Sequence, residues 1–311
     1  MLISICIPCY KSSKTLPKVY ESVVEEFKKH PEHDYQFVLV NDGSPDATFA
    51  AIKELASKDD KVTGVDLSRN YGQVNAKMAA LQYADGDVIV FMDDDGQHPA
   101  EGIFQLLAKM QEGDYDVVYA HFAKKKASFF KKLTSDMHNH IAEKMDNKPK
   151  GIHRSSFTIW SRPVVDALKN YHSPFTSIGS YLMKVTTKYA DVQVEHKERI
   201  AGKSGYTFKK LFKMWSNIFF SFSMKPLRMA TIFGVIFSMA GFFWGIFLII
   251  RKLIHPEILA GYTSTLVILL VIGGLIMIFL GIIGEYIGRI YMTVSGMPQY
   301  NVREVVGNDK K

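Results

Sequence analysis

Three aspartates, Asp93, Asp94 and Asp95, follow one another directly after a short apolar run at 88–92. Adjacent carboxylates repel one another unless a cation or a hydrogen-bond network compensates their charge. Mg²⁺ and Mn²⁺ prefer oxygen ligands of this kind and commonly join protein carboxylates to the phosphates of a substrate. The aspartates therefore predict a metal site, with Mg²⁺ or Mn²⁺ as cofactor, that holds a nucleotide diphosphate.

Polar clusters also follow three earlier apolar runs. They are Pro8, Cys9 and Tyr10 after 2–7; Asn41, Asp42, Gly43 and Ser44 after 35–40; and Ser68, Arg69 and Asn70 after 62–67. Taken singly, each cluster has an ordinary explanation as a turn or a solvated loop. In an open α/β sheet, however, ligands bind at the carboxyl ends of the strands. Together with the aspartates, the clusters predict one binding site along a single edge of a sheet.

The elements that would position these clusters alternate along the first 120 residues. Strand-like runs occur at 2–7, 35–40, 62–67, 88–92 and 115–119, and helix-like stretches at 15–29, 46–58, 73–83 and 101–110. A βα repeat of this kind predicts an α/β fold with a mostly parallel sheet covered by helices on both faces. Residues 121–150 are basic and polar and predict a loop that leads into a helix.

Several other functions find no support in the sequence. It contains no phosphate loop ending in Gly-Lys-Ser/Thr, and no Gly-x-Gly-x-x-Gly follows the first strand, so kinase and dinucleotide-binding classes are disfavoured. Cys6 and Cys9 have redox-motif spacing, but Cys6 falls inside a strand and not at a helix N-terminus. We expect His98, beside the aspartates, to be a loop residue and not a zinc ligand.

Two long apolar stretches lie in the C-terminal half. Residues 229–250 and 258–284 contain no charged side chain, and each exceeds the ~20 residues that a helix needs to cross a bilayer. Between 206 and 223, aromatic and aliphatic residues recur at helical spacing on one face and lysines lie on the opposite face, which is typical of a helix in the membrane interface. An ordinary amphipathic surface helix is the alternative for that segment.

Basic residues flank the predicted spans and give their orientation. Lys203, Lys209, Lys210, Lys213, Lys225 and Arg228 precede the first span, and Arg289, Arg303, Lys310 and Lys311 follow the second. Because cytoplasmic segments are enriched in basic residues, we expect a multi-pass protein of the cell (inner) membrane with the N-terminal domain and both termini in the cytoplasm. The N-terminus shows no signal-peptide pattern. We interpret the net charge of +7 as affinity for the lipid bilayer and not for nucleic acid.

These features divide the chain into four predicted parts. They are a cytoplasmic domain at 1–204, an interfacial amphipathic helix at 205–228, a two-helix transmembrane domain at 229–290, and a cytoplasmic tail at 291–311.

Motifs in both halves carry a family resemblance. The stretches Ile5–Tyr10, Val40–Asp46, Leu67–Gln73 and Met92–Gln97 resemble glycosyltransferase family 2. Ala201–Tyr206, Pro226–Arg228 and Gly284–Tyr291 resemble its polyprenyl-phosphate branch, which includes dolichol-phosphate and undecaprenyl-phosphate enzymes. The resemblance covers nearly the whole chain and implies a Rossmann-like nucleotide-diphospho-sugar transferase fold. Bacterial members are often tetramers, which implies a homo-oligomer.

The resemblance also implies roles for individual residues. The metal ligands would be Asp93, Asp95 and Gln97; the nucleotide-binding residues Pro8, Tyr10, Asp42, Arg69, Asn70, Gln73 and Asp94; the catalytic residues Asp93, Asp95 and Arg162; and the lipid-phosphate ligands Lys132, Arg199 and Lys203. Asp42 would recognise the base. The contacts of Asp42 would also decide between UDP and GDP, a choice that the sequence leaves open.

The sequence departs from the family at two positions. Ser156 stands where relatives carry a carboxylate that could act as a base, and Thr158 where they carry an arginine that could bind phosphate. A lipid phosphate has a second pKa of about 6, so it can attack the sugar without losing a proton to a base. In-line attack would invert the anomeric configuration, with the metal stabilising the departing diphosphate.

These inferences together predict an enzyme that transfers a hexose or modified hexose from a nucleotide-sugar, most simply a UDP-sugar, to undecaprenyl phosphate. Two alternatives remain. A processive polysaccharide synthase would need more spans and a Gln-x-x-Arg-Trp motif, which the sequence lacks. A non-catalytic nucleotide-binding membrane scaffold would be unaffected by Asp95→Ala.

Overall fold

The computed structural model describes residues 1–122, 151–171, 178–195, 225–254 and 261–307. Several of the expectations above therefore lie outside the described residues: the lipid-phosphate ligands Lys132, Arg199 and Lys203, the interfacial helix at 206–223, and the loop and helix at 121–150 beyond residue 122. The chain divides into two compact units, one formed by Met1–Phe212 with Pro298–Lys311 and the other by Lys213–Met297.

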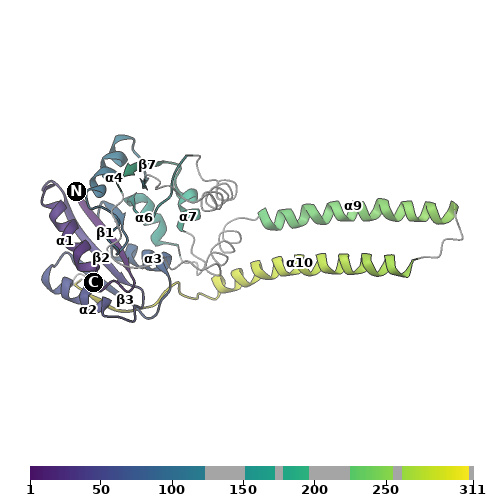
Figure 1. Ribbon diagram of the computed structural model, residues 1–311, viewed down its shortest axis with the longest axis horizontal. Helices are drawn as coiled ribbons and strands as arrows, with labels where there is room; N and C mark the ends of the chain where they lie inside the picture. The colour runs from purple at the N-terminus through teal and green to yellow at the C-terminus, as the bar shows by residue number, and fades with distance from the viewer. Residues whose placement is uncertain (123–150, 172–177, 196–224, 255–260, 308–311) are drawn as a thin grey trace. The chain divides into compact units, whose positions relative to one another are not determined.

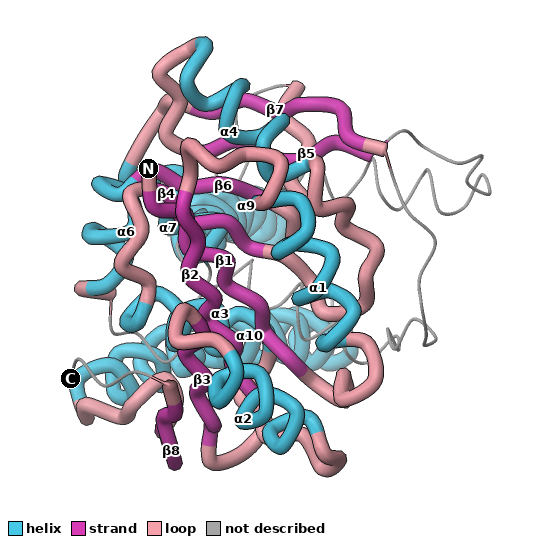
Figure 2. Tube along the Cα trace, turned by 90° about the vertical axis from the view of Figure 1, so that its left-hand side faces the viewer, coloured by secondary structure: helices cyan, strands magenta, loops and turns pink. Residues whose placement is uncertain are grey.

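The first unit is built on a mixed sheet, with eight strands in the described parts of the chain (Figure 2). They are β1 (Leu2–Cys9), β2 (Asp34–Asn41), β3 (Val62–Leu67), β4 (Val88–Phe91), β5 (Val117–Phe122), β6 (Thr158–Ser161), β7 (Tyr189–Val194) and β8 (Val302–Val306). Their order across the sheet is β7-β5-β6-β4-β1-β2-β3-β8. Only β6 and β8 run antiparallel to their neighbours, which confirms the predicted mostly parallel sheet.

Helices cover both faces of this sheet (Figure 1). Helices α1 (Leu16–Phe27), α2 (Thr48–Lys58) and α4 (Gly102–Glu112) pack on one face; α3 (Gln73–Tyr83), α6 (Arg162–Lys169) and α7 (Ile178–Val185) pack on the other. The central strands are buried from both sides, which explains why they read as continuous apolar runs without alternation.

The C-terminal tail completes the sheet. Strand β8 pairs antiparallel with β3, with Val306 opposite Gly64, and Arg303 forms an ion pair with Asp66 (Nη1 to Oδ2, 3.3 Å). A Cβ atom on Gly64 would lie 2.8 Å from the Val306 side chain, so glycine allows the close approach. The sequence predicted only a tail here. The sheet of the first unit therefore contains chain from before and after the two apolar helices.

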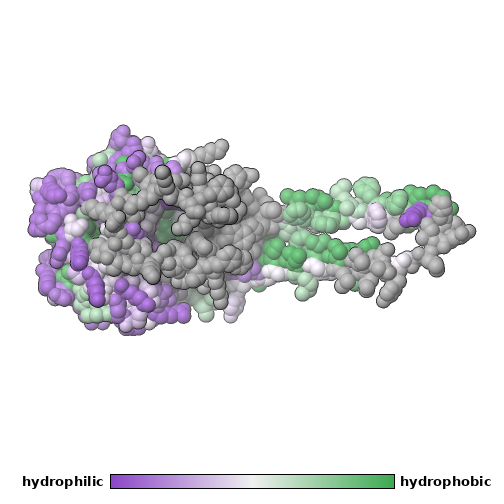
Figure 3. Space-filling model, in the orientation of Figure 1, coloured by the Kyte–Doolittle hydropathy of each residue, from purple (hydrophilic) through white to green (hydrophobic). Residues whose placement is uncertain are grey.

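The second unit consists of helices α9 (Lys225–Ile254) and α10 (Tyr262–Val294). The stretches Ala230–Arg251 and Val271–Val294 are long and apolar enough to cross a membrane. Their aromatic and aliphatic side chains are largely exposed, and both helices are hydrophobic along most of their length (Figure 3). Two candidate membrane-spanning helices are thus present, as the sequence predicted.

Candidate active site

The four polar clusters meet at one edge of the sheet. Strands β1, β2, β3 and β4 are parallel, so the loops that follow them all begin at the same rim. We call these loops L1 (10–15), L2 (42–47), L3 (68–72) and L4 (92–101). Hydrogen bonds join L1 to L4, L1 to L2, L2 to L3, and helix α3, which follows L3, to L4. The loops therefore form one closed network.

Loop L1 is held by its backbone. The amide of Tyr10 donates to Asp94 Oδ2 at 2.9 Å, and the amide of Lys11 donates to Ser44 Oγ at 3.1 Å. Burial raises the pKa of Asp94, while the Tyr10 amide favours the charged form. The ring of Tyr10 is 46% exposed beside this contact, so it is available to a ligand at the rim.

Asp42 organises loop L3. Its carboxylate is buried and accepts the amides of Tyr71 at 2.7 Å and Gly72 at 2.9 Å, and Asn70 Nδ2 donates to its backbone carbonyl at 3.1 Å. Burial raises the pKa of Asp42, and the two amides oppose that shift. In this structure Asp42 therefore shapes the loop that presents Arg69 and Asn70, both of which are exposed at the rim. Recognition of the base by Asp42 stays a prediction.

Asp93 is held by two uncharged donors. Gln73 Nε2 donates to its Oδ1 at 2.7 Å, and Ser156 Oγ donates to its Oδ2 at 2.6 Å. The carboxylate of Asp95 accepts the amide of Gln97 at 3.0 Å on Oδ1. Ser156, at the position where relatives carry a carboxylate, thus positions a predicted metal ligand in this chain.

These residues fit the predicted Mg²⁺ or Mn²⁺. Asp93 and Asp95 are both partly exposed on L4, with Gln97 on the same loop, so these three side chains offer oxygen ligands. Hard divalent ions favour such a set, while softer ions favour nitrogen or sulfur. Because Gln73 and Ser156 fix the Asp93 carboxylate without bringing a positive charge, its negative charge remains available to a cation.

His98 supports Asp93, a role that the sequence did not reveal. The buried imidazole accepts the Asp93 amide on Nδ1 at 3.0 Å, and its Nε2 lies 3.6 Å from Asp93 Oδ2. The ring stacks on Phe157 and Phe122, with centroids 4.8 and 5.7 Å away. The sequence placed His98 in a loop beside the aspartates, but its stacking partners, Phe122 at the end of β5 and Phe157 just before β6, are distant in the sequence.

We expect His98→Leu to weaken Mn²⁺ binding by about 10-fold, the range typical of residues that orient metal ligands. His98→Asn should retain most of the affinity, because an asparagine oxygen can accept the Asp93 amide in place of Nδ1. Titration of each purified variant with Mn²⁺ measures the difference. Equal affinities for the two variants would show that the hydrogen bond to Asp93 is unimportant.

Arg162 is separated from this rim. It follows β6, which is antiparallel to β4, with Ser161 opposite Val88 at the start of β4. Its guanidinium donates to the carbonyl of Ala84 at 3.0 Å and pairs with Asp166 at 2.8 Å. The sequence-based assignment of Arg162 to catalysis is therefore corrected, because the residue anchors α6 at the opposite edge of the sheet.

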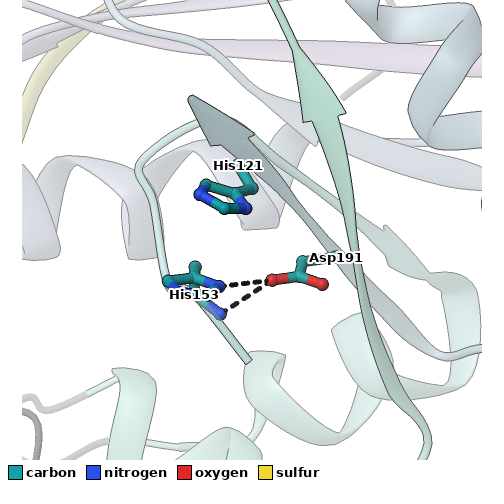
Figure 4. Close-up of side chains that lie close together, drawn as sticks. All are labelled: His121, His153 and Asp191. Atoms are coloured by element: carbon teal, nitrogen blue, oxygen red, sulfur yellow. Dashed lines mark hydrogen bonds and ion pairs between the residues drawn. The ribbon is translucent and has the colours of Figure 1, made fainter. Parts of the chain in front are cut away.

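A second polar cluster lies at the end of β5 (Figure 4). His121, His153 and Asp191 offer ligand atoms that all lie within 4.8 Å of one another. Asp191 Oδ2 accepts the backbone amide of His153 at 3.0 Å and lies 2.9 Å from its Nδ1, and the two imidazoles stack at 4.1 Å. Two imidazoles suit zinc-like ions better than Mg²⁺. The cluster is thus chemically distinct from the aspartates of L4, and its hydrogen bonds fix His153 against β7.

Family models match both units of the chain. Residues 4–167, more than half of the sequence, match the model described as glycosyl transferase family 2. Residues 225–290 match the model described as GtrB C-terminal hairpin, which corresponds to α9 and most of α10. The two matches agree with the resemblance seen in the motifs of both halves.

Similar proteins cover the whole chain. An undecaprenyl-phosphate 4-deoxy-4-formamido-L-arabinose transferase of Proteus mirabilis is 33% identical over 99% of this chain and 95% of its own length. An uncharacterized glycosyltransferase of Bacillus subtilis is also 33% identical, with the same coverage. Among solved structures, glucosyl-3-phosphoglycerate synthase of Mycobacterium tuberculosis, with Mn²⁺ and UDP-glucose, superposes with a TM-score of 0.50 at 16% identity, over 68% of this chain and 74% of that one. By its fold, its loops and these matches, the chain belongs to glycosyltransferase family 2.

Proposed function

We propose that the protein transfers a sugar from a UDP-sugar to undecaprenyl phosphate, in a metal-dependent reaction that inverts the anomeric carbon. The observation that carries the proposal is the closed network of L1–L4, which gathers Tyr10, Asp42, Asp93 and Asp95 at the carboxyl edge of the sheet. Ligands of open α/β folds bind at that edge.

The donor would bind across the four loops. The ring of Tyr10 and the side chains of Arg69 and Asn70, all exposed, would contact the nucleoside and its phosphates. Mg²⁺ or Mn²⁺ held by Asp93 and Asp95, with Gln97 beside them, would stabilise the negative charge of the departing diphosphate. The solved mycobacterial synthase, which contains Mn²⁺ and UDP-glucose, has the same fold.

The acceptor supplies its own nucleophile. A phosphate monoester carries nearly two negative charges at neutral pH, so its oxygen can attack without a general base. This agrees with Ser156, which cannot remove a proton as a carboxylate could and instead donates to Asp93. The relative from Proteus mirabilis, named for undecaprenyl phosphate and similar over the full chain, supports the choice of acceptor. The protein's task is then to hold the phosphate in line with the anomeric carbon.

We place the reaction at the cytoplasmic face of the cell membrane. Strand β8, which follows α10, pairs with β3, which precedes α9. Two consecutive spans would therefore return the chain to the side that it left. The exposed apolar side chains of α9 and α10 need cover, and lipid together with further copies of the chain in a homo-oligomer would provide it.

The test is a transfer assay. Full-length protein in detergent is incubated with undecaprenyl phosphate, Mn²⁺ and a panel of UDP- and GDP-sugars, among them UDP-4-deoxy-4-formamido-L-arabinose. Mass spectrometry of the lipid fraction should show one sugar added to the lipid phosphate, and EDTA should abolish it. If no donor yields a lipid-linked sugar, the proposal is wrong.

A further inference from the structure

A pocket of about 180 Å³ lies beside Asp93, on the face of the sheet that α3 and α7 cover. Its walls include Gln73 and Lys77 of α3, Arg154 from the segment that leads into β6, Thr158 of β6, and Gly179 of α7. Two of these five residues, Lys77 and Arg154, are basic. The pocket therefore suits an anion of a few heavy atoms.

Lys77 reaches the pocket from the middle of α3. Its Nζ donates to the carbonyl of Ser156 at 3.2 Å and lies 4.9 Å from the centre of the Phe91 ring. Among the described residues, the Ser156 carbonyl is the hydrogen-bond acceptor of Lys77. Because an ammonium group has three N–H donors, Lys77 can also donate to a ligand. Burial lowers the pKa of Lys77 to about 8, although the Asp93 carboxylate favours the charged form. Lys77 is half-buried and thus brings a basic group to this point.

Arg154 is placed from two sides. A Cβ atom on Gly179 would lie 2.9 Å from Arg154 Nη1, so the missing side chain at 179 makes room for the guanidinium. The neighbouring residue, His153, is fixed by its backbone amide and ring to Asp191 (Figure 4). The cluster at the end of β5 thus anchors the segment from which Arg154 projects.

The pocket adjoins the predicted metal site through shared residues. Gln73 lines the pocket and donates to Asp93, and Ser156 joins the two places because its hydroxyl bonds Asp93 while its carbonyl accepts Lys77. Thr158, at the position where relatives carry an arginine, also lines the pocket, but its hydroxyl donates to the Val118 carbonyl at 2.8 Å. Cations for a ligand here come from Lys77 and Arg154 instead.

We propose that this pocket binds the phosphate monoester of the acceptor, with Lys77 and Arg154 as its cationic ligands. The inference rests on the proposed function and adds to it the place from which the nucleophile approaches. A phosphate monoester with nearly two negative charges matches the two basic side chains. In this pocket it would lie next to Asp93, the predicted metal ligand on the donor side. Lys77 and Arg154 would also offset the repulsion between two anionic substrates.

Lys77→Met tests the assignment. We expect the KM for undecaprenyl phosphate to rise at least 10-fold while the KM for the nucleotide-sugar changes less than about 2-fold, since one charge-assisted contact to the acceptor is lost. We also expect the melting temperature to stay level or rise, because an apolar side chain replaces a charge that is partly removed from water. A residue with only a structural role would instead lower the melting temperature and leave the KM for the acceptor unchanged.

Further variants complete the experiment. Arg154→Met should repeat the selective rise in acceptor KM, and Lys109→Met on the opposite face should change neither constant. Binding of a short-chain prenyl phosphate and of UDP, each measured calorimetrically on the full chain, separates the two anions: Lys77→Met should weaken only the first. Weaker UDP binding with unchanged prenyl phosphate binding would overturn the proposal in favour of a donor site. An unchanged acceptor KM in an active enzyme would overturn it while leaving the transferase function intact.

Discussion

Asp95→Asn is expected to lower kcat/KM for sugar transfer by about 10³-fold, which corresponds to about 4 kcal/mol of lost transition-state stabilisation. The amide removes the negative charge that attracts the divalent ion but keeps the size of the side chain and an oxygen for the Gln97 amide. Asp93→Asn should have a similar effect, although its amide would also face the donors of Gln73 and Ser156. Initial rates at saturating Mn²⁺ measure the loss.

Asp94→Asn is the matched control, since it makes the same change one residue away. Asp94 accepts the Tyr10 amide, a contact that an asparagine oxygen can keep, and burial already raises the pKa of its carboxyl group. We expect a loss of about 10-fold or less, and Mn²⁺ affinity near that of the unmodified protein. If the three variants lost activity and Mn²⁺ affinity equally, the metal would not be held by Asp93 and Asp95.

Strands β1 to β4 and the two apolar helices follow from local sequence, whereas strands β6 and β8 do not. Strands β1 to β4 were predicted within two residues at each end, because each is a buried apolar run bounded by turn residues. Strand β6 has only four residues, and β8 contains Arg303 and Glu304. Their strand conformation comes from pairing with β4 and β3, which are distant in the sequence. No local pattern encodes such pairing.

The candidate site shows the same division. The carboxylates and loop residues were found because polar clusters after parallel strands must share one edge. The side chains that hold Asp93 were missed, because Ser156 comes from a distant part of the sequence and His98, although on the same loop, is oriented by stacking on Phe122 and Phe157. Arg162 was expected at the edge of the sheet that carries the aspartates. Because β6 runs antiparallel to β4, the end of β6 and Arg162 lie at the opposite edge, and the sequence around Arg162 does not indicate this direction.

Gly43→Ala is expected to disrupt the site as a whole. Gly43 has a φ of +57°, and a Cβ atom there would lie 2.3 Å from the carbonyl carbon of Arg69 and 2.5 Å from the amide nitrogen of Asn70. Both are backbone atoms, so loop L3 must shift as a body. The left-handed conformation alone costs about 1–2 kcal/mol for a residue with a side chain.

A shift of L3 would also displace the predicted metal ligand Asp93, because Gln73 follows L3 directly and donates to Asp93. Asp42 holds L3 by two amides, and Gln73, directly after L3, holds Asp93. We therefore expect Gly43→Ala to lower kcat/KM by about 10²-fold, since a displacement of about 1 Å at a reacting centre has effects of that size. The melting temperature should fall by several degrees, at about 2–4 °C for each kcal/mol.

Gly72→Ala separates the clash from the backbone conformation. Gly72 also has a positive φ, +89°, but a Cβ atom there would meet nothing within 4 Å. With a ψ of 154°, Gly72 lies in a region that is essentially restricted to glycine, so Gly72→Ala carries a large conformational cost but no clash with L3. It should therefore lower the melting temperature at least as much as Gly43→Ala, with a smaller loss of activity. Thermal unfolding and transfer assays of the two variants side by side measure the contrast. Equal losses of activity in the two variants would mean that contact between L2 and L3 does not position the aspartates, and that the four loops act independently of one another.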